Sequence, residues 1–169
     1  MKRLGVNIDH VATVRNARGS FHPDPFTIAK HVIKCGAHSV TIHLREDRRH
    51  IKDADVVKIC KNKKIITNLE ISLNEKIINI ALKNKPNFIC IVPEKRKEVT
   101  TEGGLNLIKN KKKIKAIISL FNKKNIRTSL FVDPTLKDIK IAKELNANCV
   151  ELHTGKISNL VKENKNYKN

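Results

Sequence analysis

Apolar runs of strand length recur along this chain, and each is followed by polar residues and then by a segment with helical periodicity. The runs are almost continuous in Val, Ile and Leu, which is typical of parallel strands that are covered on both faces. Strands are expected over residues 4–8, 39–44, 65–69, 87–92, 128–132 and 148–152. Strand–helix units repeated in this way predict a parallel α/β fold.

Capping residues indicate where the intervening helices begin and end. Asp24, followed by Pro25, is a good start signal, and Gly36 suits the position just after the helix end. Asp53, Asn74 and Asp133 are the other expected caps. The helices predicted in this way cover residues 25–35, about 53–61, about 74–83 and a segment after 134, together with a long amphipathic stretch at 105–123.

Two parallel architectures compete, a doubly wound sheet and a (βα)₈ TIM barrel. Nearly every predicted strand carries polar or charged residues at its carboxyl end, and a barrel gathers all of these ends around one pocket. No Gly-rich nucleotide-binding motif follows the first strand. The prediction is therefore a single incomplete TIM-barrel domain over residues 1–169, with about six strand–helix units. A full barrel has eight strands and ~250 residues, so two strands are expected to be missing.

Composition argues against two other classes of protein. The formal net charge is +19, but most of the basic residues are Lys that accompany Asn and Ile, and aromatic residues make up 4% of the chain. A nucleic-acid-binding module is therefore the less favoured alternative, because no stacking platform accompanies the charge. No apolar stretch reaches the ~18 residues of a membrane helix. We expect neither a nucleic acid nor a membrane as partner.

The cysteines indicate a compartment. Cys35, Cys60, Cys90 and Cys149 are widely spaced among apolar neighbours. We expect four buried free thiols in a reducing environment, and hence a cytoplasmic protein.

Two strand ends carry the first candidate catalytic groups. Period-two alternation places Glu70 on the same face as Asn68 and Ile66, so its carboxyl group should enter the barrel mouth, where burial raises a carboxyl pKa towards that of a general base. His43 ends another strand and is followed by residues 45–50, which contain three Arg and a second His. Arg binds phosphate well, so recognition of a phosphate or acid is favoured over a solvated charge run.

Further polar groups follow the first and sixth strands. Asn7, Asp9 and His10 come after the first strand, and a loop at residues 15–19 adds two Arg side chains. Glu151 and His153 end the sixth strand. Together they predict a pocket for a phosphorylated polyhydroxy or keto substrate. The spacing of the His residues does not resemble a metal site.

Longer strings resemble one known family, the pyridoxine 5′-phosphate synthases. The matching strings are residues 5–19 (GVNIDHVATVRNARG), 41–51 (TIHLREDRRHI), 68–70 (NLE), 92–96 with 98–104 (VPEKR and EVTTEGG) and 151–155 (ELHTG). The resemblance implies a TIM barrel that condenses 3-amino-1-hydroxyacetone phosphate (3-amino-2-oxopropyl phosphate) with 1-deoxy-D-xylulose 5-phosphate in vitamin B6 biosynthesis. It also implies a transferase without metal or organic cofactor, and a cytoplasmic homo-oligomer, octameric in the family.

The resemblance also implies roles for individual residues. His43 and Glu70 match the family's general bases, and Glu151 matches a carboxylate that stabilises the transition state. Asn7 matches the contact to the amino ketone phosphate. Contacts to the deoxyxylulose phosphate are implied for Asp9, His10, Arg18, Arg45, His50 and Thr100.

The chain departs from the family pattern after Gly155. The family's seventh strand ends in a Gly-His-Gly segment whose His is a general acid, and its eighth strand precedes a phosphate-binding loop. Neither is present in this sequence, so the chain is expected to be truncated at its carboxyl end. The alternative function is therefore a non-catalytic truncated remnant of the same enzyme.

Overall fold

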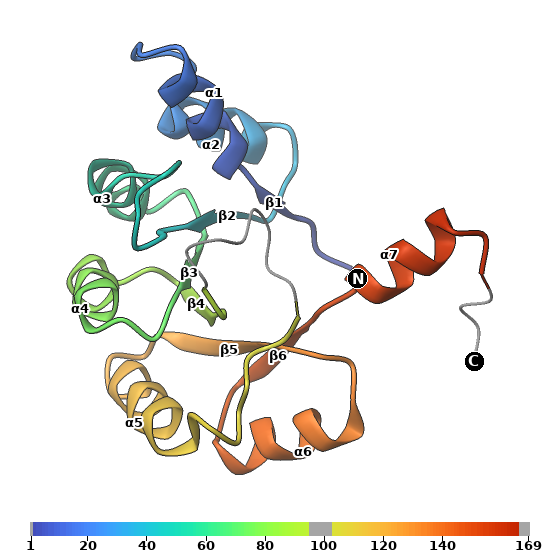
Figure 1. Ribbon diagram of the computed structural model, residues 1–169. Helices are drawn as coiled ribbons and strands as arrows, with labels where there is room; N and C mark the ends of the chain where they lie inside the picture. The colour runs from blue at the N-terminus through green and yellow to red at the C-terminus, as the bar shows by residue number, and fades with distance from the viewer. Residues whose placement is uncertain (1, 95–102, 166–169) are drawn as a thin grey trace.

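The computed structural model describes residues 2–94 and 103–165. Its six parallel strands lie side by side in chain order, β1-β2-β3-β4-β5-β6. Their bounds are Gly5–Asn7, Ser39–His43, Thr67–Ile71, Phe88–Ile91, Arg127–Val132 and Cys149–Leu152. The sheet curls into a half-barrel, with the helices along its outer side (Figure 1). This is the predicted TIM-barrel architecture with about six units. The strands follow one another in chain order, and this excludes the doubly wound alternative, in which the order of the strands reverses at a point within the sheet.

Helices α1 to α6 cover the outer face of the sheet, with α1 and α2 both between β1 and β2, whereas α7 after β6 has no buried residue. Their bounds are α1 Asp9–Ala17, α2 Pro25–Lys34, α3 Asp53–Lys61, α4 Glu75–Asn84, α5 Lys111–Asn122, α6 Leu136–Glu144 and α7 Gly155–Lys162. In β3, Thr67, Leu69 and Ile71 are buried against this layer, whereas Asn68 and Glu70 point into the half-barrel. The alternation predicted for Asn68 and Glu70 is therefore correct.

Several predicted helix ends are confirmed by their hydrogen bonds. The Asp24 carboxylate accepts a hydrogen bond from the backbone N–H of Thr27 at 3.0 Å. Asn74 caps α4 by accepting from Lys76 at 2.9 Å. Gly36 follows α2 with a φ of 101°, a conformation that glycine adopts without strain.

Other boundaries differ from the prediction. β3 begins two residues later than expected, because Ile65 is held in a turn by a hydrogen bond to the carbonyl of Asn62. Helix α5 occupies only part of the predicted 105–123 stretch. The N–H of Leu105 instead donates to the carbonyl of Phe131, which draws the preceding segment against β5.

Two predicted caps are also wrong. Thr135, not Asp133, caps α6 by accepting from Asp138 at 3.1 Å, while Asp133 accepts from Gly104 at 2.9 Å. Asp53 is the first residue of α3 rather than its cap.

Helix α1 was not predicted at all, because its short polar sequence directly follows β1 and resembles a loop.

The cysteine prediction is only half correct. All four thiols are free, but Cys60 and Cys90 are buried whereas Cys35 and Cys149 are exposed. Apolar neighbours in the sequence do not guarantee burial at a helix end or on an outer strand. Among the described helices, none has the length and apolar character needed to cross a membrane.

Candidate active site

The end of β1 is fastened to the end of β2 by the buried carboxylate of Asp9. One oxygen, Oδ1, accepts a hydrogen bond from the backbone N–H of His43 at 2.7 Å. The other, Oδ2, accepts from the side-chain amide of Asn7 at 2.8 Å, and the Asn7 carbonyl oxygen accepts from the N–H of Asp9 at 2.9 Å. Asn7 and Asp9 therefore hold each other and fix the strand that carries His43.

His43 lies at the centre of the predicted residues. Its Nδ1 is 3.6 Å from Oε2 of Glu70 on β3, and its Nε2 is 3.6 Å from Oε2 of Glu94, which follows β4. The ring of His50 lies with its centroid 5.9 Å from that of His43. Three strand ends therefore deliver an imidazole and two carboxyl groups to one buried point.

The environment of Glu70 prepares it to exchange protons near neutral pH. Burial raises its pKa from 4.5 to about 7, against the opposing effect of His43; the negative charges of Asp9 and Glu151 raise it further. A carboxyl group with this pKa is populated in both protonation states at neutral pH, so it can take up or release a proton.

Glu94 is the residue of this cluster whose role the sequence did not indicate. Its side chain is 2% exposed. Oε1 accepts a hydrogen bond from the backbone N–H of Glu46 at 2.9 Å and lies 3.8 Å from Nε of Arg45. Burial favours a higher pKa for Glu94, but His43, the Glu46 N–H and Arg45 outweigh it and lower the pKa below its usual value. Glu94 is therefore an ionised carboxylate.

The Arg-rich segment after β2 is largely neutralised by its own acidic residues. Arg45 is buried, with its Nε 3.5 Å from Asp47. Arg49 pairs with the same Asp47 at 2.7 Å, and Arg48 pairs with Asp53. The six-residue run is therefore not an uncompensated cationic surface, and Arg45 is its buried member beside His43 and Glu94.

Arg15, expected to add a guanidinium group near the pocket, is held by an ion pair. Arg15 is buried and makes two hydrogen bonds to the carboxylate of Asp55, at 2.7 and 2.9 Å. This pair joins α1 to α3, and Arg15 Nη2 also donates to the carbonyl of His50 at 3.4 Å. A sequence does not reveal such a partner, since the two residues are 40 positions apart.

The remaining predicted residues lie at different distances from the cluster. His50 is buried, and burial lowers its pKa, with Asp9 opposing and His10 among the charges that add to the effect. His10 is exposed on α1. Arg18 is exposed at the end of that helix, and its side chain has no hydrogen bond or ion pair within residues 2–94 and 103–165. Thr100 lies outside the described residues.

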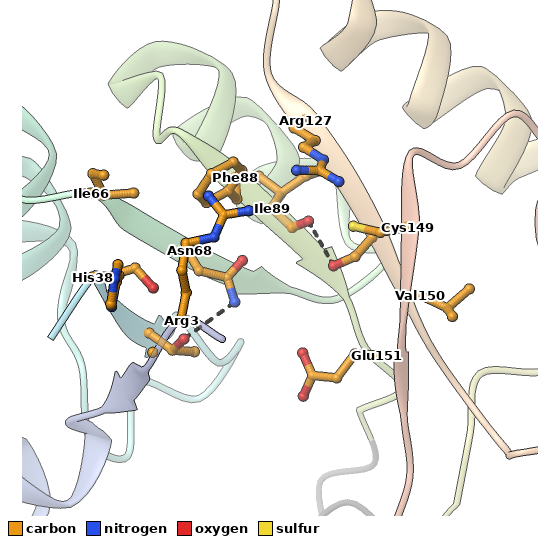
Figure 2. Close-up of a pocket in the computed structure, with 14 residues that line it drawn as sticks. Arg3, His38, Ile66, Asn68, Phe88, Ile89, Arg127, Cys149, Val150 and Glu151 are labelled. Atoms are coloured by element: carbon orange, nitrogen blue, oxygen red, sulfur yellow. Dashed lines mark hydrogen bonds between the residues drawn. The ribbon is translucent and has the colours of Figure 1, made fainter. Parts of the chain in front are cut away.

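Glu151 reaches the interior from β6 and borders a pocket of about 480 Å³. Figure 2 shows Glu151 and Asn68 projecting into this pocket from opposite sides, with Arg3, Phe88 and Arg127 also around it. Asn68 donates a hydrogen bond to the hydroxyl of Thr41 at 3.3 Å. Most residues around this pocket lie at or before the amino ends of the strands, and neither His43 nor Glu70 lines it, so it is separate from the cluster at the carboxyl ends.

Asp9, His43 and His50 are the described residues best placed to hold a metal ion. Their potential ligand atoms all lie within 4.8 Å of one another. Asp9 Oδ1, however, already accepts the His43 N–H, and His50 Nδ1 accepts the N–H of Ile51 at 2.9 Å. These two atoms already accept hydrogen bonds from backbone N–H groups, so the three residues suit a hydrogen-bonded cluster better than a metal site.

Comparison with known proteins gives consistent matches over nearly the whole chain. The family model described as pyridoxal phosphate biosynthesis protein PdxJ matches residues 4–169. The pyridoxine 5′-phosphate synthase of Pelagibacter ubique (strain HTCC1062) is 92% identical over 169 residues, which are 100% of this chain and 71% of that relative. The synthase of Zymomonas mobilis is 49% identical over 161 residues, covering 95% of this chain and 63% of the relative.

Solved structures with similar folds have little sequence in common with the chain. An L-ribulose 3-epimerase superimposes with a TM-score of 0.55 at 7% identity, covering 90% of this chain and 60% of that one. A D-psicose 3-epimerase gives a TM-score of 0.53 at 12% identity, covering 89% of this chain and 62% of that one. At these identities the likeness concerns the fold alone.

Proposed function

Since the chain belongs to the family of the pyridoxal phosphate biosynthesis protein PdxJ, we propose that it acts as a pyridoxine 5′-phosphate synthase. The reaction joins 3-amino-1-hydroxyacetone phosphate to 1-deoxy-D-xylulose 5-phosphate and releases phosphate and water. The observation that carries the proposal is the position of His43, 3.6 Å from each of two buried carboxyl groups. Imine formation, enolisation and elimination all require proton transfers, and this cluster supplies groups for them.

We assign the proton transfers to Glu70 and His43. Glu70, with a pKa of about 7, is ionised in a large fraction of molecules at neutral pH and can remove a proton from a bound substrate. His43, next to it, can accept that proton through Nδ1 and return it to a leaving oxygen. Glu151 approaches from β6 and is the proposed carboxylate that stabilises positive charge in the transition state.

Polar groups around the cluster are the proposed substrate contacts. Asn7, at the end of β1, is assigned to the amino ketone phosphate. The deoxyxylulose phosphate is assigned to Asp9, His10, Arg18, Arg45, His50 and Thr100. Arg45 is the best supported of these, because it is a buried cation next to the proposed bases and guanidinium groups bind phosphate oxygens well.

We further propose that the protein is cytoplasmic and forms a homo-oligomer, without a nucleic acid or a membrane as partner. Four free cysteines support a reducing compartment. Light scattering on the purified protein tests the assembly, and a monomer at micromolar concentration would contradict it.

The direct test of the proposed function is product formation. The purified chain is incubated with both substrates, and pyridoxine 5′-phosphate is followed by chromatography and by phosphate release. The Pelagibacter ubique relative serves as the positive control, and His43→Asn and Glu70→Gln as negative controls. We expect product from the chain when it is supplied with the part of the Pelagibacter ubique relative that it does not cover, and a loss of roughly 10²–10⁴-fold in each variant. Substrate binding without product would instead identify a non-catalytic member of the family.

A further inference from the structure

The strand-end residue Glu94 has no place in the roles proposed so far, although it is among the most buried carboxylates near His43. We propose that Glu94 is the positioning residue of His43: it holds the imidazole proton on Nε2 and thereby leaves Nδ1 to exchange a proton with Glu70. The inference deepens the proposed function and rests on it for its kinetic consequence. Its structural consequence does not depend on turnover.

The position of Glu94 is fixed by two backbone contacts, one to the end of β3 and one to the loop after β2. The N–H of Val92 donates to the carbonyl of Ile71 at 2.9 Å and extends the ladder between β3 and β4 by one residue. Pro93 then ends it, since proline has no N–H to donate. The next residue is Glu94, whose Oε1 accepts the N–H of Glu46 at 2.9 Å. This bond ties the loop after β4 to the loop after β2.

The two carboxylate oxygens of Glu94 therefore have different partners. Oε1 is used by the Glu46 N–H, and Oε2 is the atom that faces Nε2 of His43 at 3.6 Å. Both Oε2 and Nε2 are buried and have no other hydrogen-bond partner in the part of the chain that is described. A shift of a few tenths of an ångström joins them, and burial makes leaving either atom unsatisfied costly.

An ionised carboxylate can only accept a hydrogen bond, so its partner nitrogen must carry the proton. With Nε2 protonated, Nδ1 faces Oε2 of Glu70 at 3.6 Å and can share a proton with it. The other charged or titratable groups around His43 are Asp9, bound to its backbone N–H, and His50 and Arg45. Within residues 2–94 and 103–165, Glu94 is the carboxylate on the Nε2 side of the ring.

The substitution Glu94→Gln tests this arrangement sharply, because the Glu46 N–H orients the new amide. The Gln carbonyl oxygen must occupy the Oε1 position to accept that N–H, which turns the NH₂ group towards Nε2 of His43. An NH₂ group donates, so Nε2 must become the acceptor and the ring proton must move to Nδ1. The variant has nearly the same shape as the natural residue but demands the opposite tautomer.

The experiment is a two-bond ¹H–¹⁵N correlation spectrum of the histidine rings at pH 6, with the His43 signals assigned from the His43→Asn variant. We expect a protonated Nε2 with an unprotonated Nδ1 in the natural chain, and an unprotonated Nε2 with a protonated Nδ1 in Glu94→Gln. The control Glu144→Gln, whose carboxylate pairs with Lys111 at the surface, should leave the His43 signals unchanged. An unprotonated Nε2 in the natural chain overturns the proposal, whether or not the variant folds.

The kinetic arm separates positioning from substrate binding. A histidine held in the wrong tautomer costs ~10⁴ in kcat in a serine protease, and general acid–base catalysis as a whole contributes roughly 10²–10⁴. Glu94→Gln should therefore lower kcat by at least roughly 10²-fold with little change in KM. An unchanged kcat in a variant with the switched tautomer overturns the positioning role. If the natural chain makes no product, the proposed function fails while the tautomer result still decides this inference.

Discussion

At the scale of single residues, Glu70 shows how a strand end creates chemistry. Period-two alternation turns its side chain inward, and the curl of the sheet removes it from water. The rise of its pKa to about 7 follows mainly from this burial. Neither His43 nor a bound ion is needed to explain the rise, because the nearby imidazole acts in the opposite direction.

This shift predicts a pH-dependent penalty on folding. The unfolded chain releases the Glu70 proton near pH 4.5, while the folded chain keeps it until about 7. Stability is thus lost as pH rises between these values, by about 3 kcal/mol at most. Glu70→Gln lacks this loss, so its free energy of unfolding relative to the natural chain should increase from pH 4.5 to pH 8. Urea unfolding at both pH values measures the difference, and a constant difference would contradict the assignment.

The inward position of Glu70 and Asn68 could be predicted from the sequence, because alternation is a local property of a strand. The partners of His43 could not. Glu94 approaches it from a loop two strands away, and only the curvature of the sheet decides which loop that is. The same limit applies to Arg15, whose partner Asp55 lies 40 positions away in the sequence.

At the scale of elements, Asp55 joins two helices. It accepts two hydrogen bonds from Arg15 on α1 and one from the backbone N–H of Lys52, just before α3, at 2.9 Å. Asp55→Asn would leave the buried guanidinium without its counter-charge, and breaking a buried pair costs ~3–5 kcal/mol. Thermal and urea unfolding should show the loss. Glu144→Gln, which breaks a surface pair with Lys111, is the control and should leave the midpoint unchanged.

A second prediction concerns the segment before α5. A Cβ atom at Gly104 would lie 2.3 Å from the backbone nitrogen of Asp133, and backbone atoms at the end of β5 cannot move aside easily. Gly104→Ala should therefore destabilise the protein by about 1–3 kcal/mol. Gly19→Ala is a comparison with a different cause: nothing lies within 4 Å of the added atom there, but the φ of 60° strains any side chain, so its loss measures backbone strain without a packing clash. A smaller loss at Gly104 than at Gly19 would contradict the packing.

Helix ends with strong caps, such as Asn74, could be predicted because the cap and the backbone N–H that donates to it lie within a few residues. Asp133 is an equally good helix cap by its residue type and its position before Pro134. Its carboxylate, however, accepts the backbone N–H of Gly104, 29 positions earlier. Thr135 then caps α6 in its place. Competition from distant backbone groups is what local patterns cannot represent.

At the scale of the whole molecule, the curl of the sheet brings β6 back towards β3. In a flat sheet these strands would be three spacings apart, ~14 Å, and the carboxylate of Glu151 would have little influence on Glu70. In the half-barrel Glu151 is one of the charges that raise the pKa of Glu70, and Figure 2 shows the Glu151 side chain projecting into the interior. The site therefore depends on curvature as much as on sequence.

The measurement that tests this convergence most directly is a ¹³C NMR titration of the glutamate side-chain carboxyl groups in the natural chain, with Glu70 assigned from the Glu70→Gln variant. We predict that Glu70 titrates at a pKa of about 7 and that Glu151→Gln moves its titration to lower pH. A Glu70 carboxyl group that titrates near 4.5 and does not respond to Glu151→Gln would contradict the account.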